Sequence, residues 1–281
     1  MKHHIHPCLW FDGNAKEAAT FYCNVFDNAS LTADTPLVIK FQVNGEQLML
    51  LNGGPQFKLN PSISFSVVCE TDEEINRLFS NLSADGKILM PLDTYPWSER
   101  YAFFQDKYGT AWQLIKGKYS DVNQKITPCL LFVGKNFKKA EAAMKFYVEV
   151  FPQSAIEGIL LYPADSGEVA GAVQHAQFTL DEKVFMVMDG YGEHDFTFNE
   201  ALSFVVECDT QDEIDFYWNT LIANGGEESM CGWLKDKFGV SWQIIPKALE
   251  KLMQDEKRSD LVMQALLKMK KINIAALENV S

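Results

Sequence analysis

Runs in which apolar and polar residues alternate occur throughout the chain and are typical of half-buried β-strands. One such run fills residues 38–54 and is interrupted by Asn44-Gly45, a pair that tolerates the positive φ angles of a tight hairpin turn. The pattern returns over 177–190 with Asp181-Glu182 at its centre. We therefore expect a hairpin at both places, and a different kind of turn in the second.

Apolar residues three and four positions apart predict amphipathic helices. Two stripes have identical spacing: Ala15, Ala18, Ala19, Tyr22, Val25 and Phe26, then Ala140, Ala143, Met144, Tyr147, Val150 and Phe151. Two further helices should begin after Thr71 and Thr210, since Glu74 and Glu213 stand three residues later. That spacing predicts capping boxes, in which the hydroxyl and the carboxylate bind free backbone N–H groups.

The order of these elements occurs twice. The segment HIHPCLWF at 4–11 returns as KITPCLLF at 125–132, and DKYGTAWQLI at 106–115 returns as DKFGVSWQII at 236–245, with six of ten positions identical. A repeat of this length exceeds a solenoid unit, whose period is roughly 20 to 50 residues. Each copy reads strand, helix, strands, followed by strand, helix, strands, and each should have its own core.

This repeat predicts four parts. The first domain covers 1–117, the short polar linker 118–124, the second domain 125–246 and a helical tail 247–281. Pro246 ends the second copy, and the tail has apolar positions at helical spacing, including Leu252, Leu261 and Leu266. Because an apolar helix face is unfavourable in water, we expect the tail to pack on a domain or on a partner.

Composition narrows the classes of function. The chain has 281 residues, 47% of them hydrophobic, and a formal net charge of −13, which disfavours binding to nucleic acid or to an anionic membrane. Since no apolar run approaches a membrane span and no signal peptide is recognisable, a cytoplasmic location is expected. Four of the six cysteines form repeat-equivalent pairs in predicted strands, Cys8 with Cys129 and Cys69 with Cys208. This placement favours buried reduced thiols.

Four segments resemble a known family: PCLWFDGNAKEAATFYCNVF from Pro7, NGGPQFKLNPSISFSV from Asn52, FNEALSFVVECDTQDEIDFYW from Phe198 and CGWLKDKFGVSWQIIP from Cys231. They are similar to the PhnB-like proteins, also described as 3-demethylubiquinone-9 3-methyltransferase domain proteins. These belong to the vicinal oxygen chelate superfamily, together with glyoxalase I, extradiol dioxygenases and bleomycin-resistance proteins. The resemblance implies an α+β fold of tandem duplicated domains, each of two βαβββ modules forming a cupped mixed sheet.

Relatives in that superfamily often hold a divalent metal in the cup. Where they place a glutamate on the last strand, this chain has Gln113 and Gln243, and a neutral amide binds hard cations more weakly than a carboxylate does. His6 and His175 are the remaining weak candidates for metal ligands, but an exposed terminus is the favoured interpretation of His6, and a structural or solvent-facing role that of His175. A high-affinity metal site is therefore disfavoured, and the cofactor is left unassigned.

The resemblance also suggests a small-molecule ligand in the cup. Trp112 and Trp242 alternate with the two glutamines, so if the tryptophans are core residues, the glutamines face the hollow. Aromatic walls would then come from Trp10, Tyr101 and Phe103 in the first copy and Trp233 in the second, with His175 nearby. Such a lining suits a planar or hydrophobic molecule. Which face of the last strand lines the cup is left open.

Several functions stay open at this point, and no catalytic residue is assigned. The first is small-molecule binding without a high-affinity metal. The second is a metal-dependent lyase, isomerase or dioxygenase, and the third is a structural or interaction role. Methyl transfer is disfavoured, because the G-x-G at Gly190–Gly192 follows a hairpin strand and no helix is predicted directly after it. We also expect the two copies to associate as a pseudo-twofold pair within the chain, with homodimerisation undecided.

Overall fold

The computed structural model describes residues 4–255 and 257–280. The chain divides into two compact units. The large unit runs from Pro7 to Leu202, and the small unit joins the described residues up to His6 with the chain from Ser203 onward. No helix in the described residues is long and apolar enough to cross a membrane.

The large unit contains most of the strands and the first three α-helices. Its strands are β1 (His4–Phe11, which begins in the small unit), β2 (Ala29–Asp34), β3 (Val38–Val43), β4 (Glu46–Asn52), β5 (Ile63–Cys69), β6 (Lys87–Tyr95), β7 (Ser98–Gln105), β8 (Ala111–Lys116), β9 (Ile126–Phe132), β10 (Ala155–Leu161), β11 (Val173–Leu180) and β12 (Lys183–Asp189). Its helices are α1 (Ala15–Val25), α2 (Asp72–Leu82) and α3 (Ala140–Val150), with short 3-10 helices at Tyr119–Asp121, Gly134–Asn136 and Gly167–Val169.

An eight-stranded mixed sheet dominates the large unit, in the order β10-β11-β12-β9-β5-β8-β7-β6. At its centre β5 pairs antiparallel with β9, with Ser64 opposite Cys129. Four strands therefore come from the first sequence copy and four from the second. The central β5–β9 pair therefore joins strands of both copies in one sheet. The domain boundaries expected from the sequence remain a prediction.

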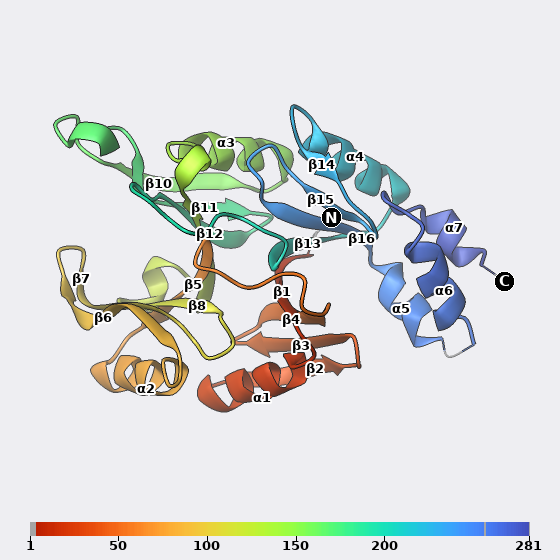
Figure 1. Ribbon diagram of the computed structural model, residues 1–281, viewed down its shortest axis with the longest axis horizontal. Helices are drawn as coiled ribbons and strands as arrows, with labels where there is room; N and C mark the ends of the chain where they lie inside the picture. Colours follow the sequence, from red (N-terminus) through yellow and green to blue (C-terminus); the bar gives the residue numbers. More distant parts are fainter. Residues whose placement is uncertain (1–3, 256, 281) are drawn as a thin grey trace. The chain divides into compact units, whose positions relative to one another are not determined.

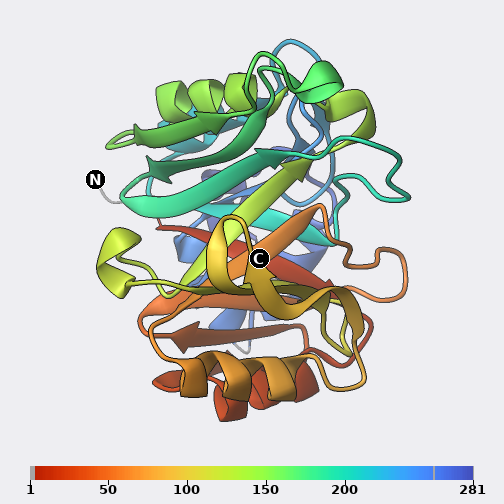
Figure 2. The ribbon, with the colours of Figure 1, turned by 90° about the vertical axis from the view of Figure 1, so that its left-hand side faces the viewer.

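The helices pack on one face of this sheet. Figure 1 shows α3 against β10–β12 and α2 against β5 and β8, both on the outer side of the curved sheet, and Figure 2 shows the same arrangement from the side. The helix-facing residues form a core that includes Phe65, Phe104 and Trp112, each fully buried. The inner face of the sheet is thus the face without helices.

The remaining strands of the large unit follow the order β1-β4-β3-β2, with β1 parallel to β4 and the others antiparallel. Helix α1 packs on these strands, and its buried residues are Ala15, Ala18, Ala19, Tyr22 and Val25. In α3 the buried residues are Ala140, Ala143, Met144, Tyr147 and Val150. Both helical stripes predicted from the spacing are therefore confirmed.

The two hairpin turns share one geometry. Asn44 and Gly45 have φ values of 50° and 86°, and Asp181 and Glu182 have 48° and 68°. Positive φ at both central positions is the pattern of a type I′ turn, which matches the twist of the flanking strands. The expectation of a different second turn was wrong. Strand twist fixes the conformation, and the second copy adopts it with residues that favour it less.

Capping follows the prediction at one helix fully and at the other in part. At α4 (Gln211–Ile222), Thr210 accepts from the Glu213 N–H and the Glu213 carboxylate accepts from the Thr210 N–H. At α2, Thr71 accepts from the Glu74 N–H at 3.1 Å, but the Glu74 carboxylate accepts from the N–H of Glu70. At α2 the carboxylate therefore binds the N–H of the residue before the N-cap, and not that of the N-cap Thr71 itself.

The small unit contains β13 (Leu202–Cys208), β14 (Glu227–Glu228), β15 (Trp233–Lys235) and β16 (Ser241–Pro246), in the order β14-β15-β16-β13. Its helices are α4 and the tail helices α5 (Ala248–Gln254), α6 (Ser259–Leu266) and α7 (Ile274–Glu278). Val262, Leu266, Ile272 and Leu277 form a buried cluster in the tail, against which Cys231 and Ile245 pack. The tail therefore packs on the second copy, as expected, although Leu261 of the predicted stripe is 37% exposed.

Candidate functional site

The inner face of the eight-stranded sheet brings polar side chains from neighbouring strands together. On β8, Gln113 lies opposite Phe103 of β7 and Ser66 of β5. Across the central pair, Ser64 lies opposite Cys129 and Ser66 opposite Thr127. Along each strand these residues alternate with the residues that face the helices. Their side chains therefore lie on the opposite, inner face of the sheet.

A chain of hydrogen bonds links three of these side chains. Tyr101 Oη donates to Gln113 Oε1 at 2.8 Å, and Gln113 Nε2 donates to Ser64 Oγ at 2.7 Å. We call Tyr101, Gln113 and Ser64 the inner-face relay. Because both ends of the amide are engaged, the Gln113 side chain is held in one orientation, and the Ser64 hydroxyl keeps its own proton to donate onward.

The relay and the thiol beside it carry no charge at neutral pH. Burial raises the pKa of the Cys129 thiol to about 12, against an opposing hydrogen bond from Gln113. Burial is also the largest cause that raises the pKa of the Tyr101 hydroxyl above its ordinary value. Desolvation disfavours the charged form of each group. The site therefore offers neutral donors and acceptors.

Thr127 adds a polar group that lacks a partner. Its side chain is 1% exposed, and its hydroxyl makes no hydrogen bond to any residue in the described part of the chain. Buried hydroxyls are nearly always hydrogen-bonded, because leaving one unpaired costs about 1–3 kcal/mol. The Thr127 hydroxyl is therefore a buried polar group beside Ser66 for which the described part of the chain provides no hydrogen-bond partner.

The donors around Gln113 do not suit a tightly bound divalent cation. The amide oxygen already accepts from Tyr101, and the neighbouring side chains offer hydroxyls and a protonated thiol. Hard cations prefer several charged oxygen ligands, and softer ones prefer thiolate or imidazole. Among residues 4–255 and 257–280 there is no group of three or more His, Cys, Asp or Glu side chains arranged to hold a metal ion.

The repeated Asp-Lys-aromatic-Gly string has a structural role on the other face. The buried Asp106 carboxylate accepts from Tyr22 Oη at 2.7 Å and from Trp112 Nε1 at 2.8 Å. It also accepts from the backbone N–H groups of Tyr108 and Thr110. Burial raises the pKa of Asp106, and these four hydrogen bonds act in the opposite direction. The aspartate thus anchors the last turn and the core tryptophan, and it joins α1 to β8.

The small unit repeats part of both arrangements. Asp236 accepts from Trp242 Nε1 at 2.9 Å, and Gln243 Nε2 donates to Ser203 Oγ at 2.9 Å. Trp233 of β15 lies opposite Gln243 of β16. The tryptophan at the end of each copy is a fully buried core residue, which decides the question that the alternation left open. The glutamines face the other side of their strands.

The remaining candidates lie apart from the relay. Trp10 is on β1, where its indole N–H donates to the Gly54 carbonyl at 2.7 Å and its ring covers Gly53 so closely that a Cβ there would lie 2.2 Å from it. His175 is half-buried on β11, four strands from β8, or roughly 19 Å at the usual strand spacing. Burial lowers the pKa of His175. His6 is buried on β1 in the small unit, so the expectation of an exposed terminus was wrong there, because the strand begins before His6 and carries it into the interior.

Sequence reasoning named Tyr101, Phe103 and Gln113, and the structure brings these three together. It missed Ser64, Thr127 and Cys129 as site residues. The alternation of serines with Ile63, Phe65 and Val67 was a usable signal, because it put every serine on one face. No local pattern could reveal that β9 of the second copy lies beside β5.

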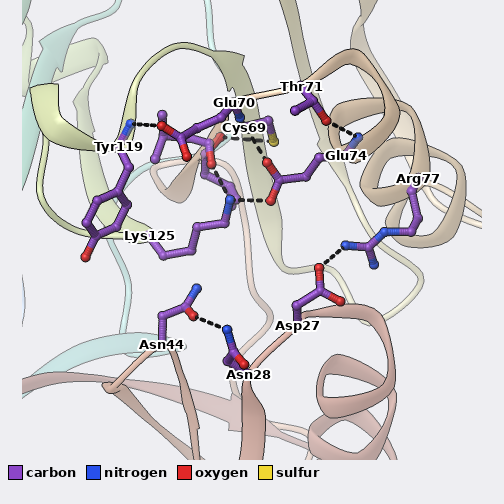
Figure 3. A network of polar contacts seen from close by, with 12 residues as sticks. Asp27, Asn28, Asn44, Cys69, Glu70, Thr71, Glu74, Arg77, Tyr119 and Lys125 are labelled. Atoms are coloured by element: carbon purple, nitrogen blue, oxygen red, sulfur yellow. Dashed lines mark hydrogen bonds and ion pairs between the residues drawn. The ribbon is translucent and has the colours of Figure 1, made fainter.

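A separate polar pocket lies at the edge of the large unit, with a volume of about 440 Å³. Figure 3 shows its side chains: Asp27 and Asn28 follow the end of α1, Asn44 lies in the β3–β4 turn, Glu70 precedes α2, Glu74 and Arg77 are on α2, Tyr119 is in the linker, and Lys125 begins the second copy. No sequence pattern indicated this cluster, because its members come from four distant segments.

Both cations in the pocket are engaged by the protein. Lys125 Nζ pairs with Glu74 at 2.6 Å and donates to the Val68 carbonyl, while Arg77 pairs with Asp27 at 2.6 Å and donates to the Val25 carbonyl. The Lys125 side chain is only 11% exposed. Each cation therefore ties one segment to another, and the cluster braces α1, α2 and the linker.

Comparison with known proteins agrees with this architecture. The family model described as 3-demethylubiquinone-9 3-methyltransferase matches residues 3–115 and again 124–245. The chain belongs to this family. The PhnB protein from Bacillus cereus is 35% identical over 40% of this chain and 98% of its own, with a TM-score of 0.38. No curated protein was found to match the chain.

A second comparison concerns the whole fold. Glyoxalase I from Zea mays superposes with a TM-score of 0.60 over 90% of this chain and 97% of its own, at 14% sequence identity. At that identity the likeness shows the fold alone. The chain is accordingly a PhnB-like protein with a tandem glyoxalase fold of the vicinal oxygen chelate superfamily, and the fold that the resemblance implied is confirmed.

Proposed function

We propose that this protein binds an uncharged small molecule on the inner face of the eight-stranded sheet, at the inner-face relay. The observation behind this proposal is the pair of hydrogen bonds that fixes Gln113 between Tyr101 and Ser64. A preoriented amide beside an apolar side chain, here Phe103 on the neighbouring strand β7, is the usual way in which pockets orient a largely apolar ligand.

The charge state of the site selects the class of ligand. Burying an ion without a partner is strongly unfavourable, and the relay offers only neutral groups. The hydroxyls of Ser64 and Thr127 suit a ligand with a carbonyl, ether or hydroxyl oxygen. A carboxylate or an ammonium group would have no compensating charge there, so a neutral ligand is favoured.

We also infer that the site works without a tightly held metal. The supporting observation is that the Gln113 amide oxygen, which would have to serve as a ligand, is committed to Tyr101. Elemental analysis of protein purified without added metal tests this inference. Less than about one tenth of an equivalent of Zn, Ni, Fe or Mn is expected, whereas a stoichiometric content would overturn it.

Methyl transfer, which the family description names, receives no support from the site. A conventional cofactor loop places glycines between a parallel strand and a helix, but the chain from Gly190 to Ala201 runs from β12 to β13 without a helix. Calorimetric titration with S-adenosylmethionine should therefore give no binding heat. Binding at micromolar affinity would reverse this assignment.

The main test uses 2-naphthol, a neutral probe with one hydroxyl group. We expect it to bind, and Gln113→Leu to weaken its binding about tenfold, since a lost hydrogen bond is worth about 1 kcal/mol and the unpaired Tyr101 hydroxyl adds to the loss. Gln47→Leu, on the half-buried strand β4, is the matched control and should leave the affinity unchanged. If 2-naphthol fails to bind, or if both variants behave alike, the proposal is wrong.

A further inference from the structure

Three aromatic rings form a cluster at the turn between β6 and β7. Tyr95 and Trp97 are stacked, with centroids 5.2 Å apart and planes at 22°. Tyr101 meets both edge-on, at 5.7 Å from each. We call Tyr95, Trp97 and Tyr101 the aromatic cluster.

The cluster is held in place by the hairpin but remains open on one side. Tyr95 Oη donates to the Pro91 carbonyl at 3.0 Å, and Thr94 Oγ1 donates to the Glu99 carbonyl at 2.9 Å. Trp97 is nevertheless 52% exposed, whereas Tyr101 is 7% exposed. A large ring that is fixed by its neighbours but faces solvent is available for contact with another molecule.

The second sequence copy shows that the fold does not need these rings. Its corresponding strands, β14 (Glu227–Glu228) and β15 (Trp233–Lys235), are much shorter, and the residues between them include no aromatic side chain. The corresponding module of the second copy therefore forms without a stacked aromatic pair. The extended hairpin and its rings are a feature of the first copy alone.

Tyr101 connects the aromatic cluster to the inner-face relay. Its ring packs against Tyr95 and Trp97, and its hydroxyl donates to Gln113. The exposed tryptophan and the amide are thus separated by one side chain. A flat molecule that binds Gln113 through its oxygen is therefore long enough to reach the rings of the aromatic cluster.

We propose that the aromatic cluster is a stacking platform that makes the site selective for planar aromatic ligands with a neutral oxygen group. This inference rests on the proposed function, since the relay supplies the polar contact. Aromatic pairs prefer stacked or edge-to-face geometry and gain free energy beyond that of area burial. Trp97 has one face on Tyr95, so its other face is the one that meets the ligand ring.

The test compares two probes of similar size, 2-naphthol and its saturated analogue decahydro-2-naphthol. The unmodified protein should bind the aromatic probe more tightly. Trp97→Ala should weaken 2-naphthol binding about five- to tenfold and leave the saturated probe within about twofold, while Trp97→Phe should restore most of the aromatic preference. Tyr191→Ala is the matched control, because Tyr191 is 53% exposed and packs on Phe137 elsewhere in the large unit.

The outcomes separate this inference from the proposed function. If Gln113→Leu weakens both probes but Trp97→Ala weakens neither, or weakens both equally, the platform is refuted and the relay stands. If Gln113→Leu affects neither probe, the proposed function fails and the platform fails with it. Thermal unfolding of each variant establishes that the hairpin change has not unfolded the protein, and a variant that stays folded but loses only 2-naphthol binding supports the platform.

Discussion

Single residues explain why one string of the sequence occurs twice. Asp106 satisfies two side-chain donors and two backbone donors at the end of the first copy, and Asp236 accepts from the equivalent tryptophan and from two backbone N–H groups in the second. Each carboxylate oxygen of Asp106 accepts two hydrogen bonds. The repeated string is thus required by the core, and the glutamine beside each tryptophan is left for the other face.

Replacing this carboxylate should destabilise the protein. In Asp106→Asn one oxygen becomes an NH₂ group that points a donor at existing donors, so we expect a loss of about 2–3 kcal/mol in the free energy of unfolding. Urea unfolding measures the loss. Asp85→Asn changes an exposed aspartate with φ of 58°, a conformation that asparagine adopts readily, and should be nearly neutral. Equal effects in the two variants would contradict the role of Asp106.

At the scale of elements, the two hairpins show that strand geometry governs the turn. Both turns have positive φ at their two central residues, although one is Asn-Gly and the other Asp-Glu. The flanking strands β3–β4 and β11–β12 pair in continuous antiparallel register, and only a turn of that hand continues their twist. Turn residues therefore adjust the stability of these hairpins more than their shape.

This reasoning predicts a purely conformational effect at Gly45. A Cβ there would meet nothing within 4 Å, but φ is +86°, so Gly45→Ala should lower the free energy of unfolding by about 1 kcal/mol through backbone strain. Gly158 also has open space and no positive φ, and Gly158→Ala should be neutral or slightly stabilising. Calorimetric melting compares the two. A neutral Gly45→Ala would show that the turn relaxes to another type.

At the scale of the whole molecule, the segment between the copies is a structural part of the large unit. Gln124 is buried and exchanges hydrogen bonds with Val184 of β12, while Lys125 reaches Glu74 of α2. This segment therefore ties the first copy to the second on both sides of the β5–β9 pair. A short polar stretch that reads as a linker is, in the folded chain, partly interior.

Removing the lysine contact should weaken this connection. Lys125→Met keeps the aliphatic stem but leaves Glu74 and the Val68 carbonyl without their partner, so we expect a loss of about 1–3 kcal/mol in unfolding free energy. Lys118→Met, at an exposed position in the same segment, should have little effect. Chemical denaturation of both variants checks this, and a stable Lys125→Met protein would show that the pocket contacts are dispensable.

The sequence by itself determined the elements, because periodicity and capping are local. The stripes of α1 and α3 and the capping residues Thr71 and Thr210 followed from spacing alone, whereas spacing left open which face of the last strand packs in the core. Gln113, Tyr101 and Phe103 could be named as site residues because the resemblance implies a cup and alternation puts them on one face. Alternation assigns side chains to opposite faces without knowledge of which strands are neighbours.

Only the tertiary structure decided which strands lie side by side. The pairing of β5 with β9 joins one copy to the other, and it places Cys129 and Thr127 of the second copy beside Ser64 and Ser66 of the first. Strand pairing depends on long-range burial, which leaves no periodic signal in the chain. The composition of the inner face, and with it the chemistry of the candidate site, therefore came from the fold.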